Sequence, residues 1–213
     1  GLSNDVLKGV ELHVNKSENL VLLGKSGSGK SIIIKCLVRL INADKGEIKI
    51  FGTDISTLNN KELNTVRLRI GFLFQNAALY DSMSVRQNMA FPLKRHFKNL
   101  SDAEADKEIE SVLESVGLLE AIDKMPSELS GGMQKRAGLA RTLILKPEII
   151  LYDEPTTGLD TITSREIIEL ILDMQKKYNT SSIIITHAMT CAKLSGDRIN
   201  ILKDGVIHSK GSY

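Results

Sequence analysis

Cysteine is scarce in this sequence, and neither sign of charge dominates it. Only two cysteines occur among 213 residues, too few for the disulfide framework of a small secreted domain. We therefore expect Cys36 and Cys191 to be reduced core residues of a protein from a reducing compartment. The 28 basic and 26 acidic side chains leave a net charge of +2, which disfavours a nucleic-acid-binding surface.

Long apolar runs and internal repeats are also lacking. No run approaches the roughly 20 apolar residues that span a bilayer, and the first residues lack the basic-then-apolar pattern of a signal peptide. We expect a chain that is soluble by itself, so that any membrane function would require a partner. Without repeats, the length predicts one domain with a sizeable core and an inserted lobe.

The segment GKSGSGKS at residues 24–31 matches the phosphate-binding pattern G-x-x-x-x-G-K-[ST] at every fixed position. Glycines allow its backbone N–H groups to approach phosphate oxygens, and the dipole of a following helix favours the same anion. Lys30 would reach the β- and γ-phosphates and Ser31 would ligate Mg²⁺. A glycine-rich turn without a ligand is the alternative. The predicted nucleotide-binding residues are Gly24, Lys25, Ser26, Gly27, Ser28, Gly29, Lys30 and Ser31.

The remaining pattern alternates between strands and helices. Apolar or alternating runs predict strands over residues 6–14, 19–23, 47–51, 70–74, 149–152 and 183–185. Helical periodicity predicts helices over 32–38 and 163–178 and a helical lobe over about 84–145, in which the charges of 102–110 form a solvated face. This order indicates an α/β fold with a parallel sheet covered by helices.

Two acids, Asp153 and Glu154, follow the buried run 149–152. Ligands bind at the carboxyl ends of strands in open α/β sheets, so this pair is well placed for chemistry. Asp153 is a natural ligand for Mg²⁺, and Glu154 would accept a proton from an attacking water. A purely structural acid pair would instead need a basic partner.

The segment LSGGMQ at residues 129–134 resembles the LSGGQ signature of ABC-transporter ATPases, with Met133 at the last position of the core motif. In that family the signature binds the γ-phosphate held by a second copy of the domain. The resemblance therefore implies a head-to-tail dimer with two shared sites. It adds Ser130, Gly131 and Gly132 to the predicted nucleotide-binding residues.

Three further positions match the family in order. Gln75 matches the glutamine that senses Mg²⁺ and attacking water and faces the membrane partner, and His187 matches the switch histidine on the γ-phosphate. Asp160 matches the D-loop at the dimer interface and joins the predicted nucleotide-binding residues. The resemblance implies that the catalytic residues are Glu154, His187, Gln75 and Lys30, with Mg²⁺ held by Ser31, Gln75 and Asp153. We interpret the other histidines as surface or core residues, namely His13, His96 and His208.

The resemblance also implies a domain layout for residues 1–213: a RecA-like P-loop NTPase core over about 1–83 and 147–213, and an inserted α-helical subdomain over about 84–146. The sequence departs from the family's pattern at two places. Ala188 replaces the common Asp after the switch histidine, which weakens one supporting contact but leaves the imidazole of His187 available. The family's N-terminal strand, with an aromatic residue that stacks on adenine, is expected to be missing.

Residues 74–93 resemble the corresponding segment of Mla-type (MCE-associated) ATPases. That resemblance implies a bacterial ATPase that couples ATP-driven dimer closure to phospholipid transport and lies on the inner face of the cytoplasmic membrane. Its implied partners are a second copy, a permease that contacts the region near Gln75, and an MCE-domain protein. The alternatives are a methionine importer, a lipoprotein-release ATPase, a non-transport ABC protein and a non-hydrolysing regulatory module.

Overall fold

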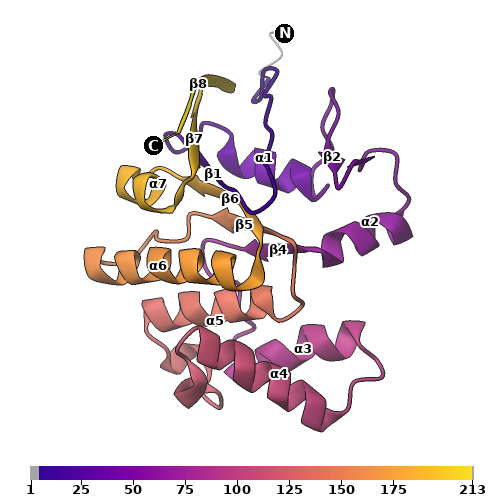
Figure 1. Cartoon of the computed structure of the whole chain (residues 1–213), viewed down its shortest axis with the longest axis vertical. Helices are drawn as coiled ribbons and strands as arrows, with labels where there is room; N and C mark the ends of the chain where they lie inside the picture. Colours follow the sequence, from indigo (N-terminus) through magenta and orange to yellow (C-terminus); the bar gives the residue numbers. More distant parts are fainter. Residues whose placement is uncertain (1–4, 213) are drawn as a thin grey trace.

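A six-stranded sheet forms the centre of the computed structural model, which describes residues 5–212 (Figure 1). The strand order is β4-β5-β6-β1-β7-β8, and all neighbours are parallel except β7 and β8. This parallel-dominated sheet with helices confirms the predicted α/β class. The strands are β1 (Asn19–Leu23), β4 (Ile70–Leu73), β5 (Ile149–Asp153), β6 (Ser181–Thr186), β7 (Arg198–Lys203) and β8 (Val206–Ser212).

Helices cover both faces of the sheet, which explains why β1 and β6 are buried along their whole length. On one face, α1 (Lys30–Leu37) packs its isoleucines against residues such as Leu22 and Ile183. On the other face, α6 (Thr161–Tyr178) and α7 (Met189–Ser195) share a core with Val21 and Ile184. Both cysteines are buried and free, as predicted.

The chain between β4 and β5 is helical, as the periodicity predicted. It contains α3 (Val85–His96), α4 (Asp102–Ser115), α5 (Gly131–Leu143) and two short 3₁₀ helices, η1 (Leu119–Ala121) and η2 (Pro126–Glu128). Capping boxes at Ser84 and Ser101 fix where α3 and α4 begin. In Figure 1, α5 lies directly below α6, and α3 and α4 lie farthest from the sheet.

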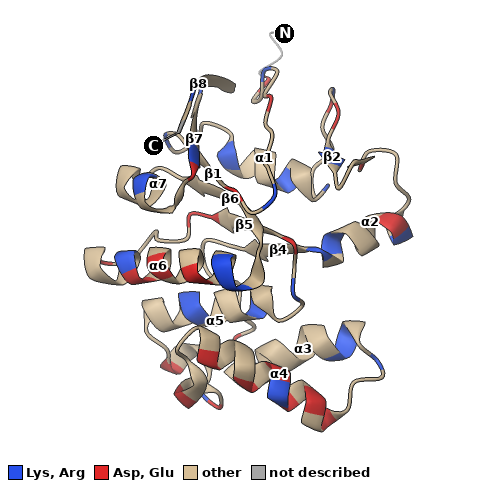
Figure 2. Ribbon diagram, in the orientation of Figure 1, with Lys and Arg blue, Asp and Glu red and all other residues tan. Residues whose placement is uncertain are grey.

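The charged residues of α4 point mainly to solvent, as predicted, while Ala105, Ile109 and Leu113 are buried. The ribbon in Figure 2 marks residues of both signs along α4 and α6, whereas α3 and α5 carry only basic ones. None of the described helices has the length and apolar character needed to cross a bilayer.

The predicted strand over residues 47–51 is shorter in the structure, where β2 covers Lys49–Ile50. The chain turns at Phe51 and Gly52, both at positive φ, and β3 (Thr53–Asp54) pairs with β2 as a hairpin. The helix α2 (Asn60–Leu68) follows and leads into β4.

The predicted strand over residues 6–14 is wrong, since the described part of this segment forms no strand. Its apolar side chains Val10, Leu12 and Val14 do pack against the core under α1. Its backbone, however, is tied to the body through Lys8 N–H, which donates to Gly205 O at 2.7 Å in the β7–β8 turn. The side chains of this segment therefore alternate between half-buried and exposed although its backbone forms no ladder of strand hydrogen bonds.

Candidate nucleotide-binding and catalytic site

The phosphate-binding loop connects β1 to α1, as its sequence pattern requires. Gly24 N–H donates to Thr186 O of β6 at 3.2 Å, and a Cβ at Gly24 would lie only 2.5 Å from Leu202 O. Gly29 caps α1 with φ +101°, a conformation that side chains rarely adopt. The glycines therefore set the shape of the loop, and its N–H groups lead into a helix N-terminus that favours anions.

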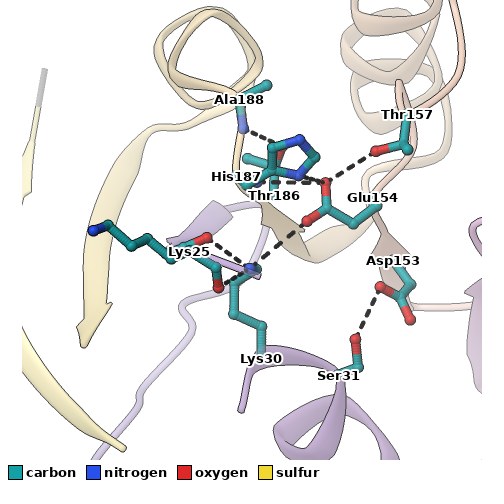
Figure 3. A network of polar contacts seen from close by, with 10 residues as sticks. Lys25, Lys30, Ser31, Asp153, Glu154, Thr157, Thr186, His187 and Ala188 are labelled. Atoms are coloured by element: carbon teal, nitrogen blue, oxygen red, sulfur yellow. Dashed lines mark hydrogen bonds and ion pairs between the residues drawn. The ribbon is translucent and has the colours of Figure 1, made fainter. Parts of the chain in front are cut away.

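Lys30 is almost fully buried, with 5% of its side chain exposed. Its ammonium donates to the carbonyl oxygens of Gly24 at 2.7 Å and Lys25 at 3.0 Å, and its Nζ lies 3.7 Å from Oε1 of Glu154 (Figure 3). The loop thus surrounds a cation that is satisfied by its own carbonyls and by the acid at the end of β5.

Glu154 follows β5 and has φ +51°, an uncommon conformation for a residue with a side chain. Its backbone N–H donates to Ile185 O at 3.0 Å, which anchors the turn to β6. Its Oε2 accepts a hydrogen bond from Thr157 Oγ1 at 3.2 Å and lies 2.9 Å from His187 Nδ1 (Figure 3). The sequence-predicted acid and histidine are therefore in direct contact.

Ser31 and Asp153 form a second contact in the same region, because Ser31 Oγ donates to Asp153 Oδ1 at 3.3 Å. Burial raises the pKa of Asp153, the Ser31 hydrogen bond lowers it, and the nearby charge of Glu154 raises it further. A hydroxyl and a desolvated carboxylate form an oxygen donor set suited to Mg²⁺, which usually takes one or two protein ligands besides water and phosphate. Among the described residues, no group of three or more His, Cys, Asp or Glu could hold a metal ion. As a pair of oxygen donors, Ser31 and Asp153 fit an Mg²⁺ ion that takes its other ligands from phosphate and water.

A cavity of about 270 Å³ lies among the loop, Glu154 and His187, and Asp153 is outside its lining but is hydrogen-bonded to Ser31, which belongs to it. It lies at the carboxyl edge of the parallel strands, where α/β sheets bind ligands. Gln75 enters it from the loop after β4, and His187 from the end of β6. The lining residues are Ser26, Gly27, Gly29, Lys30, Ser31, Ile32, Gln75, Glu154, Thr157 and His187.

The signature residues and Asp160 lie outside the described lining of this cavity. Ser130 caps α5 by accepting a hydrogen bond from Met133 N–H at 3.3 Å, and Asp160 caps α6 by accepting from Ile162 and Thr163 N–H at 2.9 and 3.0 Å. The two caps are neighbours, because a Cβ at Gly132 would lie 2.7 Å from Thr163 Cγ2. One copy of the chain therefore brings together two separate groups of predicted site residues.

Sequence reasoning missed Thr157, which lines the cavity and contacts Glu154. Its position between Glu154 and Asp160 was the available signal. It also missed Lys135, a buried lysine whose ammonium donates to the carbonyl oxygen of Gln75. Burial lowers the pKa of Lys135, and the charges of Asp153 and Glu154 act against that shift.

The position of the missing Asp after the switch histidine is taken by Ala188, whose N–H donates to Thr186 Oγ1 at 3.0 Å (Figure 3). The other three histidines are exposed, in agreement with their surface interpretation.

The fold and the cavity define a P-loop nucleotide-binding protein of the α/β class. The family model described as "ABC transporter" matches residues 7–157, and the chain belongs to this family. The ATPase domains of this family bind ATP with Mg²⁺.

Two curated relatives illustrate the range of names within the family. The chain is 40% identical over 205 residues to "Methionine import ATP-binding protein MetN" of Rhizobium etli, covering 96% of this chain and 56% of that protein. It is 42% identical over 200 residues to "Probable ribonucleotide transport ATP-binding protein mkl" of Mycobacterium leprae, covering 94% and 57%. The chain thus spans just over half the length of these relatives.

Solved structures agree with the fold along nearly the whole chain. The ATP-binding cassette MJ0796, described as a post-hydrolysis dimer bound to ADP and Pi, is 31% identical with a TM-score of 0.88, covering 97% of this chain and 90% of that one. CbiO1 of Clostridium perfringens, described as part of the ABC transporter complex cbiONQ, is 29% identical with a TM-score of 0.90, covering 100% and 84%.

Proposed function

We propose that this chain is the ATP-hydrolysing subunit of a bacterial ABC transporter. The observation that carries the proposal is one cavity lined by the phosphate-binding loop, by Glu154 and by His187. Asp153 lies beside this cavity, because it accepts a hydrogen bond from Ser31 of the lining. Each group has a separate task in phosphoryl transfer, and a merely structural site would not need all of them. The helical subdomain would extend over about residues 84–146, between two parts of the core.

Lys30 would bind the β- and γ-phosphates, exchanging its hydrogen bonds to Gly24 and Lys25 for phosphate oxygens. Ser31, Asp153 and Gln75 would hold Mg²⁺, which supplies neutralising charge on the phosphates when bound. Pre-arranged positive charge of this kind is the main source of catalysis in phosphoryl transfer.

Glu154 would act as the general base. The oxygen of water attacks the γ-phosphorus, its proton passes to a carboxylate oxygen of Glu154, and the bond from phosphorus to the bridging oxygen of ADP breaks. Thr157 and His187 contact Oε2, so they would orient the carboxylate, and His187 would also reach the γ-phosphate.

Phosphate release from ATP by the purified chain tests this proposal directly. We expect Mg²⁺-dependent release that is abolished in Lys30→Met, because that variant lacks the phosphate-binding cation. ATP turnover that is equal in both proteins would overturn the assignment.

We also propose a head-to-tail dimer with two shared sites. Two observations support it. Ser130 and Asp160 lie outside the cavity of their own chain, and they cap neighbouring helices, so they form one surface that a second copy could contact. In a two-fold dimer, each contact between positions i and j occurs twice, so two composite sites form. Ser130 and Gly132 of a second copy would then face the γ-phosphate held by Lys30.

Mixing two inactive variants tests the shared site. Lys30→Met and Ser130→Arg damage opposite sides of it, so a mixed dimer has one doubly damaged site and one intact site. Statistical mixing would restore about a quarter of the wild-type rate, since half of the dimers are mixed and each has one good site. If mixed dimers are detected but the mixture hydrolyses ATP no faster than the two variants do separately, the shared site is contradicted.

A second cavity of about 200 Å³ supports the proposed contact with a membrane permease. It lies between β4 and α3 beside the Gln75 region and is lined by aromatic and basic side chains, among them Phe72, Tyr80, Phe91, Arg95 and Arg141. A permease segment bound here would place the chain on the inner face of the cytoplasmic membrane. Phe91→Asp should then abolish co-purification with the permease without reducing ATP binding.

For the cargo we propose phospholipid, moved by an Mla-type system that includes an MCE-domain protein. The support is the resemblance of residues 74–93 to Mla-type ATPases. Methionine is the second candidate, because a relative 40% identical is named as a methionine importer. Co-purification of an MCE-domain protein together with ATP-dependent phospholipid transfer would favour the first, and ATP-dependent methionine uptake by the assembled complex would favour the second.

A further inference from the structure

The helix α5 begins at the signature motif and runs past the loop that carries Gln75. We define this loop, residues 74–80, as the Gln75 loop. Lys135, in the second turn of α5, is 5% exposed, and its ammonium donates to the carbonyl oxygen of Gln75. An ammonium that is removed from water is costly unless its hydrogen bonds compensate, so this buried lysine requires an explanation.

Lys135 is one of three successive contacts between α5 and the loop. At Gly138, a Cβ would lie 2.8 Å from Ala77 Cβ and 3.1 Å from Ala77 Cα, so the helix surface touches the loop backbone. At Arg141, the guanidinium donates to the carbonyl oxygen of Ala78. Residues spaced by three lie on one helix face. This face therefore holds the loop at three consecutive positions.

The backbone of the Gln75 loop is strained at the points where α5 holds it. Ala77 and Ala78 have φ values of +57° and +51°, in the left-handed region that residues with a Cβ rarely adopt. Such conformations persist only where the surroundings determine them. The carbonyl contacts from Lys135 and Arg141 bracket this pair, so they are suited to maintaining it.

We propose that Lys135 is a positioning residue, which fixes the backbone of the Gln75 loop on α5 and thereby sets where the Gln75 side chain lies in the nucleotide cavity. The same helix is capped by Ser130, so the signature motif and the contact with the Gln75 loop lie on one continuous helix. This inference rests on the proposed ATPase function. It adds a link between the signature motif at Ser130, which would face a second copy, and Gln75, which would face the nucleotide.

The test compares Lys135→Met, which removes the donor and the charge, with Lys135→Gln, which keeps a donor. Hydrogen exchange of the amides in residues 74–80 and steady-state ATP hydrolysis are measured on the full chain. For Lys135→Met we expect exchange about tenfold faster in this loop alone and a kcat reduced about tenfold, with the KM for ATP within about twofold of wild type. Lys135→Gln should recover most of both.

The matched control is Lys146→Met, because Lys146 lies just after α5 with 64% of its side chain exposed. It should behave as wild type in both measurements. Lys135→Met removes the cost of burying a charge but leaves the carbonyl oxygen of Gln75 without its donor, so the folding of this variant is checked first by urea unfolding. If it does not fold, Gly138→Ala pushes the same loop away from α5 and should give the same local exchange and the same loss of kcat.

Unchanged loop exchange in folded Lys135→Met, or in Gly138→Ala if that variant is used, would overturn the inference. Faster exchange with an unchanged kcat would overturn the positioning role. These outcomes differ from a failure of the proposed function, in which the wild-type chain itself would not hydrolyse ATP while the exchange experiment would still report on the loop contact.

Discussion

Thr157 provides a quantitative test of how the base is oriented. Its hydroxyl donates to Oε2 of Glu154 at 3.2 Å, and valine would replace the hydroxyl by a methyl group of nearly the same size. Hydrogen bonds to charged groups contribute about 1.5–3 kcal/mol. We take the lower end, because the distance is long and His187 Nδ1 remains 2.9 Å from the same oxygen.

A loss of about 1.5 kcal/mol in transition-state stabilisation lowers kcat about tenfold. We therefore expect Thr157→Val to show this decrease in steady-state phosphate release, with an unchanged KM for ATP, since the hydroxyl acts on the base. Thr157→Ser retains the donor and should keep at least half of the wild-type kcat. A wild-type kcat in Thr157→Val, or equal losses in the valine and serine variants, would refute the reasoning.

Two further predictions concern stability and the loop. Burial raises the pKa of Glu18, but the hydrogen bond from Arg198 at 2.6 Å and a backbone N–H outweigh it, so the net pKa is lowered. The pair therefore stabilises the fold above the ordinary value of 4.5, and this contribution is lost as the pH falls through the lower folded value. Glu18→Gln should lower the free energy of unfolding by about 1 kcal/mol near neutral pH, a modest value because Arg198 is partly exposed, and should not change it in acid. Urea unfolding at both pH values measures this, and an equal loss at the two pH values would contradict a stabilising ion pair. Gly24→Ala should abolish ATP binding in a titration with a fluorescent ATP analogue, because its Cβ would meet Leu202 O at 2.5 Å. Unaltered affinity in that variant would show that the loop geometry is not needed.

The sequence predicted the elements around the phosphate-binding loop because they follow strong local rules. An apolar run, a glycine-rich loop and a buried helix determined β1, the loop and α1, and the uninterrupted runs before Glu154 and His187 located β5 and β6. The resemblance to the ABC family implied that Glu154 and His187 share one site, and the parallel strands β5 and β6 bring them to the same edge of the sheet.

Other features depend on long-range contacts that no local pattern encodes. Residues 6–14 alternate like a strand, yet their backbone does not enter a ladder. The strands β7 and β8 were not predicted, although they are joined by a hairpin turn at Asp204 and Gly205, both at positive φ, and Asp-Gly is a known hairpin signature. The hold of α5 on the Gln75 loop joins residues 60 positions apart, so only the structure reveals it.

Glu154→Gln tests the central claim most directly, since it removes the proposed base while keeping the shape of the side chain. ATP affinity, dimer mass in the presence of ATP, and phosphate release are measured on this variant and on wild type. Unimpaired ATP binding, an ATP-dependent dimer and no turnover are the expected results. Turnover at the wild-type rate would contradict the assignment of Glu154 as the base, and with it the account of this cavity as an ATP-hydrolysing site.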